Sequence, residues 1–88
     1  MLGYSVVFTR AAERLLAGLD VSVARRIKPR VLALSENPRP SGCIKLQGRG
    51  ELYRIRVGDY RIVYRIDDGQ RLVEITIVAN RRDVYRGI

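Results

Sequence analysis

Arginine side chains recur at spacings of two and four residues in two neighbouring segments of this chain, which could build an anion-binding site. Successive side chains of a β-strand point to opposite faces, so Arg54 and Arg56 would share one face of the first segment. Arg61 and Arg65 would likewise share one face of the second segment. If the two strands pair, four guanidinium groups meet on one side of a sheet. Like charges this close repel one another and require an anion, for which a phosphate backbone is the best candidate.

The residues between these arginines are apolar and would form the opposite face of the same two strands. They are Tyr53, Ile55, Val57, Tyr60, Ile62 and Tyr64. In the last predicted strand, Val73, Ile75 and Ile77 would continue this apolar face. Glu74 and Thr76 would then lie beside the arginines.

The first half of the chain predicts a strand followed by two helices. Apolar residues alternate over 4–8, which is typical of a half-buried strand. Thr9 can cap the first helix, and Asp20 can cap a longer second helix that extends to about residue 36. Pro29 lies inside the second helix, so we expect a kink or a late restart there.

The second half predicts strands over 51–57, 60–67 and 71–79, and it leaves open a short additional strand around 43–46. Short connections make neighbouring strands antiparallel. The elements therefore predict an α+β fold in the order β-α-α-β-β-β, as one small domain over 1–88. The two N-terminal helices would pack on the apolar face of a twisted, mainly antiparallel sheet, and the arginine face would stay open.

The composition points to an anionic partner. The chain has 88 residues, of which 47% are hydrophobic, and its net charge is +8. An excess of this size favours nucleic acid, an anionic membrane surface or an acidic protein. Only Lys28 and Lys45 are lysines. Arginine grips phosphate bidentately, so the bias fits phosphate recognition, although a coding bias toward GC-rich codons would produce it as well.

Several chemistries are excluded by what the chain does not contain. It has no histidine and one cysteine, so we expect no zinc site, no Cys-His pair, no disulfide framework and no cofactor. No apolar run approaches the ~20 residues that a membrane span requires, and no signal-peptide pattern opens the chain. We expect a cytoplasmic protein with no membrane association.

Four motifs follow the helix pair in a fixed order. They are Lys45-Leu46-x-Gly48, Tyr53-Arg54-Ile55-Arg56, Tyr60-Arg61-Ile62-Val63-Tyr64 and Asn80-Arg81-Arg82-Asp83-Val84-Tyr85. This ordered set resembles the RelE/ParE superfamily of bacterial and archaeal type II toxins over essentially the whole chain. Within the superfamily it is most similar to the RelE-like mRNA interferases.

The resemblance implies a ribosome-dependent endoribonuclease. Such a toxin enters the A site of the 70S ribosome, where the 2′-hydroxyl of the mRNA codon attacks the adjacent phosphate and leaves a 2′,3′-cyclic phosphate. The catalytic positions of the family fall on Arg54, Arg56, Arg61, Arg81 and Tyr85. The residues expected to contact the RNA backbone are Lys45, Arg65 and Arg82. Arg65 and Arg82 could equally be solvated charges, and Lys45 could equally mark only the short strand of the family.

These residue types suit the reaction. Arg61 and Arg81 would clamp the non-bridging phosphate oxygens, and Tyr85 would stack on a base or donate the leaving-group proton. The identity of the general base stays open, because some members of the family carry lysines where this chain has Arg54 and Arg56, and many carry a histidine in place of Asn80. Arginine, with a pKa above about 12, is a poor base.

Three sources of the missing base remain. A carboxylate such as Glu51 or Asp59 could serve, or Tyr85 could, or the mechanism could rest mostly on positioning and charge neutralisation. The competing functions are a ParE-like inhibitor of DNA gyrase and a non-catalytic RNA- or ribosome-binding module. The family also implies a cognate antitoxin, an acidic and partly disordered chain that would wrap the toxin in a hetero-oligomer.

Overall fold

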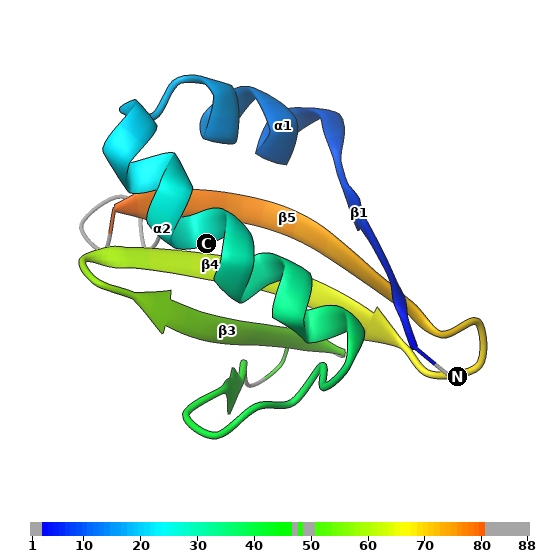
Figure 1. The fold of residues 1–88 in the computed structure, drawn as a ribbon. Coiled ribbons are helices and arrows are strands. Elements are labelled where there is room, and N and C mark those ends of the chain that lie inside the picture. The colour runs from blue at the N-terminus through cyan, green and yellow to red at the C-terminus, as the bar shows by residue number, and fades with distance from the viewer. Residues whose placement is uncertain (1–2, 47, 49–50, 81–88) are drawn as a thin grey trace.

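The computed structural model describes residues 3–46, 48 and 51–80. Two helices, a short 3-10 helix and five strands make up this part of the chain (Figure 1). The helical elements are α1 (Arg10–Ala17), α2 (Val21–Leu32) and η1 (Ala33–Ser35). The strands are β1 (Ser5–Phe8), β2 (Ile44–Lys45), β3 (Leu52–Val57), β4 (Tyr60–Asp67) and β5 (Leu72–Asn80).

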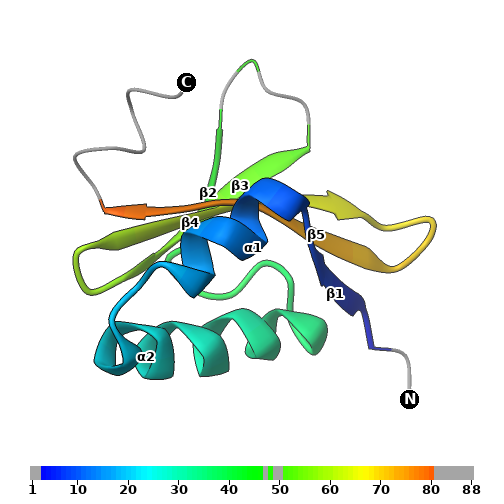
Figure 2. The same ribbon diagram turned by 90° about the horizontal axis from the view of Figure 1, so that it is seen from above.

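The five strands form one mixed sheet in the order β1-β5-β4-β3-β2. β1 runs parallel to β5, and every other neighbouring pair is antiparallel. Both helices lie on the same side of the sheet (Figure 2). The predicted α+β fold is confirmed, with the short second strand present and the first strand joining the sheet beside the last.

The core fills the space between the helices and this side of the sheet. Helical residues such as Ala12, Ile27 and Val31 are almost completely buried against strand residues such as Ile62 and Tyr64. Both helices begin where the sequence predicts them. Thr9 caps α1 by accepting a hydrogen bond from the amide of Ala12 at 3.1 Å. Asp20 occupies the N-cap of α2 without a side-chain capping bond.

Pro29 does not restart the second helix. α2 continues from Val21 to Leu32 through the proline, which costs one backbone hydrogen bond, since proline has no N–H. The carbonyl that loses this partner belongs to Arg25, whose side chain is exposed, so water can satisfy it. The helix then tightens into η1 before the Asn37-Pro38-Arg39-Pro40 segment.

One predicted core residue is wrong, because β5 contains an irregularity. Val63 pairs with Ile77 and Tyr64 pairs with Ile75, so Thr76 is an extra residue at a β-bulge. The bulge reverses the alternation, and Val78, 1% exposed, takes the core position predicted for Ile77. Ile77 instead shares the face of the arginines, while the Thr76 hydroxyl donates a hydrogen bond to the Val63 carbonyl at 3.1 Å.

Candidate nucleic-acid interface

The register of β3 and β4 places Arg56 directly opposite Arg61. Paired residues of antiparallel strands share a face, with their Cβ atoms about 4.5–5.5 Å apart. On the other side of Arg61 lies Ala79 of β5, which offers no carboxylate. We call Arg56 and Arg61 the guanidinium pair. Two positive charges are therefore held side by side on the face of the sheet that the helices leave uncovered.

Arg61 is unusual because its side chain is buried. Only 8% of the residue is exposed, and it is the only buried charged residue in the described part of the chain. Its Nε and Nη1 atoms have no hydrogen-bond partner among the described residues. An unsatisfied buried donor costs on the order of 1–3 kcal/mol, and more when it is charged. A ligand that supplies negatively charged oxygens to these two N–H groups would recover that cost.

Arg54 lies on the same face of the sheet, two residues before Arg56 on β3. It pairs with Val63 on β4 and with Ile44 on β2, and its side chain is half-buried. It makes no hydrogen bond or ion pair within residues 3–46, 48 and 51–80. The predicted grouping of Arg54, Arg56 and Arg61 on one face therefore agrees with the strand pairing.

Arg65 lies on this face as well, but acidic neighbours neutralise it. Its Nε donates a hydrogen bond to Glu74 Oε1 at 3.2 Å, and its Nη1 lies 3.8 Å from Asp67 Oδ2. On this face of the described sheet, the arginines without a carboxylate partner are therefore Arg54, Arg56 and Arg61. RNA contact by Arg65 stays a prediction, and it would have to compete with two carboxylates.

The remaining predicted site residues fall in two groups. Lys45 pairs with Tyr53, which places it on the face of the sheet that the helices cover rather than beside Arg54, and it is exposed. Arg81, Arg82 and Tyr85 lie outside the described residues. The strand that leads to them ends at Asn80, opposite Tyr60 and one pair beyond Arg61.

The two candidate carboxylates lie at opposite ends of β3. Asp59 is exposed in the turn that joins β3 to β4, and the guanidinium pair is the second residue pair from that turn. Glu51 precedes Leu52 at the far end, next to the neutralised Arg65. Asp59 is therefore the carboxylate nearer to the guanidinium pair along the strands.

A cluster of side chains around Arg39 was not anticipated from the sequence. Arg39, between two prolines, donates hydrogen bonds from Nη1 and Nη2 to both carboxylate oxygens of Asp68, at 3.2 and 2.9 Å. Its Nε donates to the Tyr53 hydroxyl at 3.2 Å, and its guanidinium carbon lies 5.0 Å from the centre of the Tyr53 ring. Tyr4 completes the cluster by donating to Asp68 at 2.6 Å. The cluster ties the segment before β2 to the β4–β5 turn.

The electrostatics of this cluster are internally consistent. The hydrogen bonds from Arg39 and then Tyr4 lower the pKa of Asp68, and the bond to Asp68 is the main cause that raises the pKa of Arg39. The same bond raises the pKa of Tyr4. Burial raises the pKa of Tyr64, which stacks on Tyr53 and donates to the Pro38 carbonyl at 2.7 Å. These groups serve the fold, and the only sequence signal for them was the rigid Pro-Arg-Pro run.

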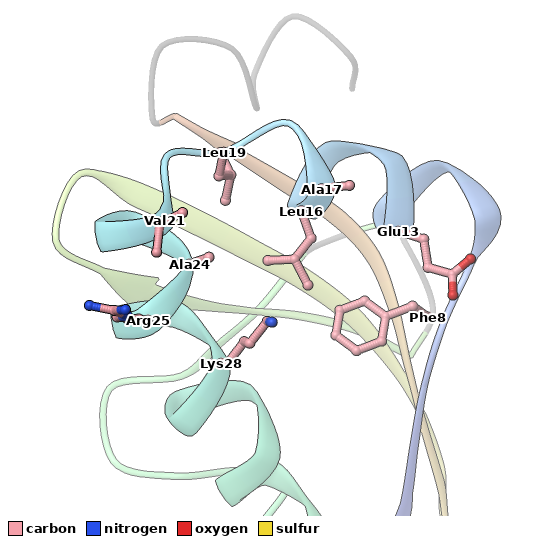
Figure 3. Close-up of a pocket in the computed structure, with 9 residues that line it drawn as sticks. All are labelled: Phe8, Glu13, Leu16, Ala17, Leu19, Val21, Ala24, Arg25 and Lys28. Atoms are coloured by element: carbon pink, nitrogen blue, oxygen red, sulfur yellow. The ribbon is translucent and has the colours of Figure 1, made fainter.

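A groove of about 600 Å³ opens on the opposite layer of the molecule, between α1 and α2 (Figure 3). Phe8, Leu16 and Lys28 point into it from β1, α1 and α2, and Arg25 lies on its rim. A smaller hollow of about 140 Å³ shares these three residues and continues to Leu32. The walls of the groove are mostly apolar, and its charged lining residues are Arg25, Lys28 and Glu13.

Basic residues also occur in the helical layer of the molecule. The segment 10–35 carries six basic and two acidic side chains, and no ion pair is found among them. The basic ones are Arg10, Arg14, Arg25, Arg26, Lys28 and Arg30, and the acidic ones are Glu13 and Asp20. The net charge of +8 is therefore spread over both layers rather than focused on the arginine face.

In the described part of the chain, no group of three or more His, Cys, Asp or Glu residues is placed to hold a metal ion. None of the described helices is long and apolar enough to span a bilayer.

Comparison with known proteins identifies the family to which this chain belongs. The protein-family model described as the ParE toxin of the type II toxin–antitoxin system parDE matches residues 6–85 of this chain. The chain is 38% identical to the toxin RelE of Mycobacterium tuberculosis over 94% of this chain and 87% of that protein. This chain belongs to the RelE/ParE superfamily of type II toxins.

Further relatives place the protein on the RelE side of the superfamily. It is 34% identical to the toxin RelG of M. tuberculosis, over 94% of this chain and 97% of that one. The archaeal RelE in the RelE–RelB complex of Pyrococcus horikoshii has the same fold, with a TM-score of 0.79 and 30% identity over 92% and 97% of the two chains. The protein is a RelE-like toxin, as its ordered motifs predict.

Proposed function

We propose that this RelE-like toxin is an endoribonuclease that cleaves the mRNA codon in the ribosomal A site. The observation that carries the proposal is Arg61, a buried guanidinium with two unpartnered N–H groups directly opposite Arg56. Within the described chain nothing compensates these charges, and an RNA phosphate has the geometry and the charge to do so.

In the proposed reaction, the 2′-oxygen forms a bond to the adjacent phosphorus while the bond from phosphorus to the 5′-oxygen of the next nucleotide breaks. The 2′-hydroxyl loses a proton, and the leaving 5′-oxygen gains one. Arg61 and Arg56 neutralise the charge that develops on the non-bridging oxygens, and Arg81 is proposed to join them. Tyr85 is proposed to stack on a base of the codon or to donate the leaving-group proton.

The base that accepts the 2′-hydroxyl proton is open between Asp59, Glu51 and Tyr85. The position of Asp59 near the guanidinium pair favours it over Glu51, which lies beside Arg65 at the far end of β3. If the reaction is mainly one of positioning and charge neutralisation, no single substitution among these three will abolish it.

Primer extension on mRNA in a purified translation system tests the proposal. We expect a cut inside the A-site codon that requires the ribosome and weakens by about 10²–10³-fold in Arg61→Ala, the loss typical of removing one transition-state donor. Arg30→Ala is the matched control, because it removes the same charge from an exposed position on α2. Intact mRNA at high protein concentration, or equal losses in both variants, contradicts the proposal.

Gyrase inhibition is the second candidate function, because the family model that matches the chain is that of a ParE toxin. Inhibition of DNA supercoiling without RNA cleavage would favour it. Binding to ribosomes with intact mRNA would instead favour a module without catalysis.

The proposed regulatory partner is a cognate antitoxin with an acidic, partly disordered chain, forming a hetero-oligomer with the toxin. The archaeal relative was solved as a RelE–RelB complex. On this chain, the groove between α1 and α2 is mostly apolar and is lined by two basic residues, Arg25 and Lys28, against one acidic residue, Glu13, so it suits an amphipathic acidic segment. Reversing both charges, Arg25→Glu with Lys28→Glu, should weaken antitoxin binding in calorimetry, whereas unchanged affinity would place the acidic chain elsewhere.

A further inference from the structure

An apolar side chain stands in the open beside the arginines of the uncovered face. Ile44 of β2 is 48% exposed, and it pairs with Arg54 of β3. The same row continues across the sheet through Val63 and Ile77. We call these four residues the Ile44 row. Isolated exposed apolar residues are common, but this one lies beside arginines that have no carboxylate partner among the described residues.

Arg54 gives the Ile44 row a planar cation. The side chain is half-buried between Ile44 and Val63 and makes no hydrogen bond or ion pair in the described part of the chain. A guanidinium has a flat face, which is a surface on which nucleobases stack. Ile44 adds an apolar wall next to that plane.

The spacing relates this row to the guanidinium pair. Arg54 and Arg56 are two residues apart on one face of β3, which corresponds to about 6.6–6.8 Å along the strand. Ile44 lies one strand further, about 4.8 Å from β3. One nucleotide spans such a distance between its phosphate and its base. A phosphate held by Arg56 and Arg61 would therefore bring a base of the same or the neighbouring nucleotide over Ile44 and Arg54.

We propose that Ile44 and Arg54 form a seat for a nucleobase of single-stranded RNA, adjacent to a phosphate at the guanidinium pair. The inference rests on RNA as the substrate class given under the proposed function. It assigns to Ile44 a part in positioning the codon that is separate from phosphate binding. The base stacks on the Arg54 plane and buries apolar surface against Ile44.

A binding cycle with abasic RNA tests the seat directly. The probe is a fluorescent single-stranded RNA hexamer with 2′-O-methyl riboses, which cannot be cleaved, and six analogues that each lack one base. Fluorescence anisotropy at low salt gives the dissociation constants. For the unmodified protein, we expect one or two adjacent abasic positions to weaken binding about tenfold, in the range typical of base stacking.

The variant Ile44→Asn should weaken binding of the intact hexamer by a similar factor and should no longer distinguish it from the sensitive abasic analogue. Ile44→Leu should restore most of the discrimination, because it keeps the apolar wall. Leu15→Asn is the matched control, since Leu15 is 41% exposed on α1, in the other layer of the molecule. Circular dichroism confirms that each variant is folded.

The outcomes separate this inference from the proposed function. Sensitivity to a missing base that survives in Ile44→Asn overturns the seat, even if the ribosomal cleavage assay succeeds. Loss of that sensitivity in Ile44→Asn but not in Leu15→Asn supports the seat, even if no cleavage is found. Arg61→Ala should weaken all seven RNA molecules by the same factor, because it removes phosphate contact only.

Discussion

Replacing Arg61 with methionine should make the protein more stable while it removes phosphate binding. Methionine keeps most of the aliphatic volume, so the substitution leaves little cavity, and it removes the two buried N–H groups that have no partner in the described chain. It also ends the repulsion with Arg56 on the paired strand. Only 8% of Arg61 is exposed, so little compensating hydration is lost.

The magnitude follows from the cost of burying unsatisfied charged donors. At about 1–3 kcal/mol for each unsatisfied group, partly offset by residual water contact, the free energy of unfolding should rise by about 2 kcal/mol. In a domain of this size, that corresponds to an increase in Tm of roughly 8–16 °C. The urea midpoint should rise by about 1 M with an unchanged slope.

The assay is urea unfolding at neutral pH in buffers with and without inorganic phosphate. Phosphate should stabilise the unmodified protein by RT ln(1 + [L]/Kd), which is about 2.7 kcal/mol at 100 times Kd, and should have no effect on Arg61→Met. Arg56→Met is the control, because Arg56 is exposed and its removal should change stability by no more than about 0.5 kcal/mol. A loss of 1 kcal/mol or more in Arg61→Met without phosphate would refute the reasoning, because it would mean that the guanidinium is satisfied within the chain.

Three further predictions concern the fold. The pKa of Asp68 is lower in the folded protein than in the unfolded chain, so its pair with Arg39 stabilises the fold above the unfolded pKa of about 3.9, and this stabilisation is lost as the pH falls through the folded pKa. Unfolding measured across acidic pH should show this loss of stability in the unmodified protein and not in Asp68→Asn. Gly58→Ala should cost about 1 kcal/mol or more by thermal unfolding, because Gly58 has a φ of 60°, which residues with a Cβ rarely adopt; an unchanged Tm would contradict that backbone conformation. Thr9→Ala should cost about 1 kcal/mol in the same assay, whereas Thr9→Ser should cost little because it keeps the capping hydroxyl.

Most of the fold could be predicted because local periodicity decides it. The alternation in β3 is regular, and in β4 it is interrupted only by Val63, so the apolar face and the arginine face both follow from residue spacing. The helix start at Thr9 was predictable because capping depends on one residue and its immediate neighbours. Asp20 also occupies the predicted N-cap position, although its side chain makes no capping bond. The parallel pairing of β1 with β5 was not predicted, because it joins residues far apart in the sequence.

The errors and omissions have physical causes of the same kind. A single extra residue at Thr76 exchanges Ile77 for Val78 in the core, and no local composition marks the bulge. The bonds from Arg39 to Asp68 and Tyr53 join three segments that only the folded chain brings together. The sequence indicated that Arg61 lies on the arginine face, but its burial depends on the packing of that face.

The pairing of β1 with β5 also affects how the protein can be made. Ser5 pairs with Leu72, so the first strand to leave the ribosome has its sheet neighbour in the last described strand. β5 pairs in addition with β4, which carries Arg61. A nascent chain that has not yet released β5 therefore lacks the strand that joins β1 to β4, and it presents an incomplete sheet. The folded basic face is thus acquired only after β5 has left the ribosome.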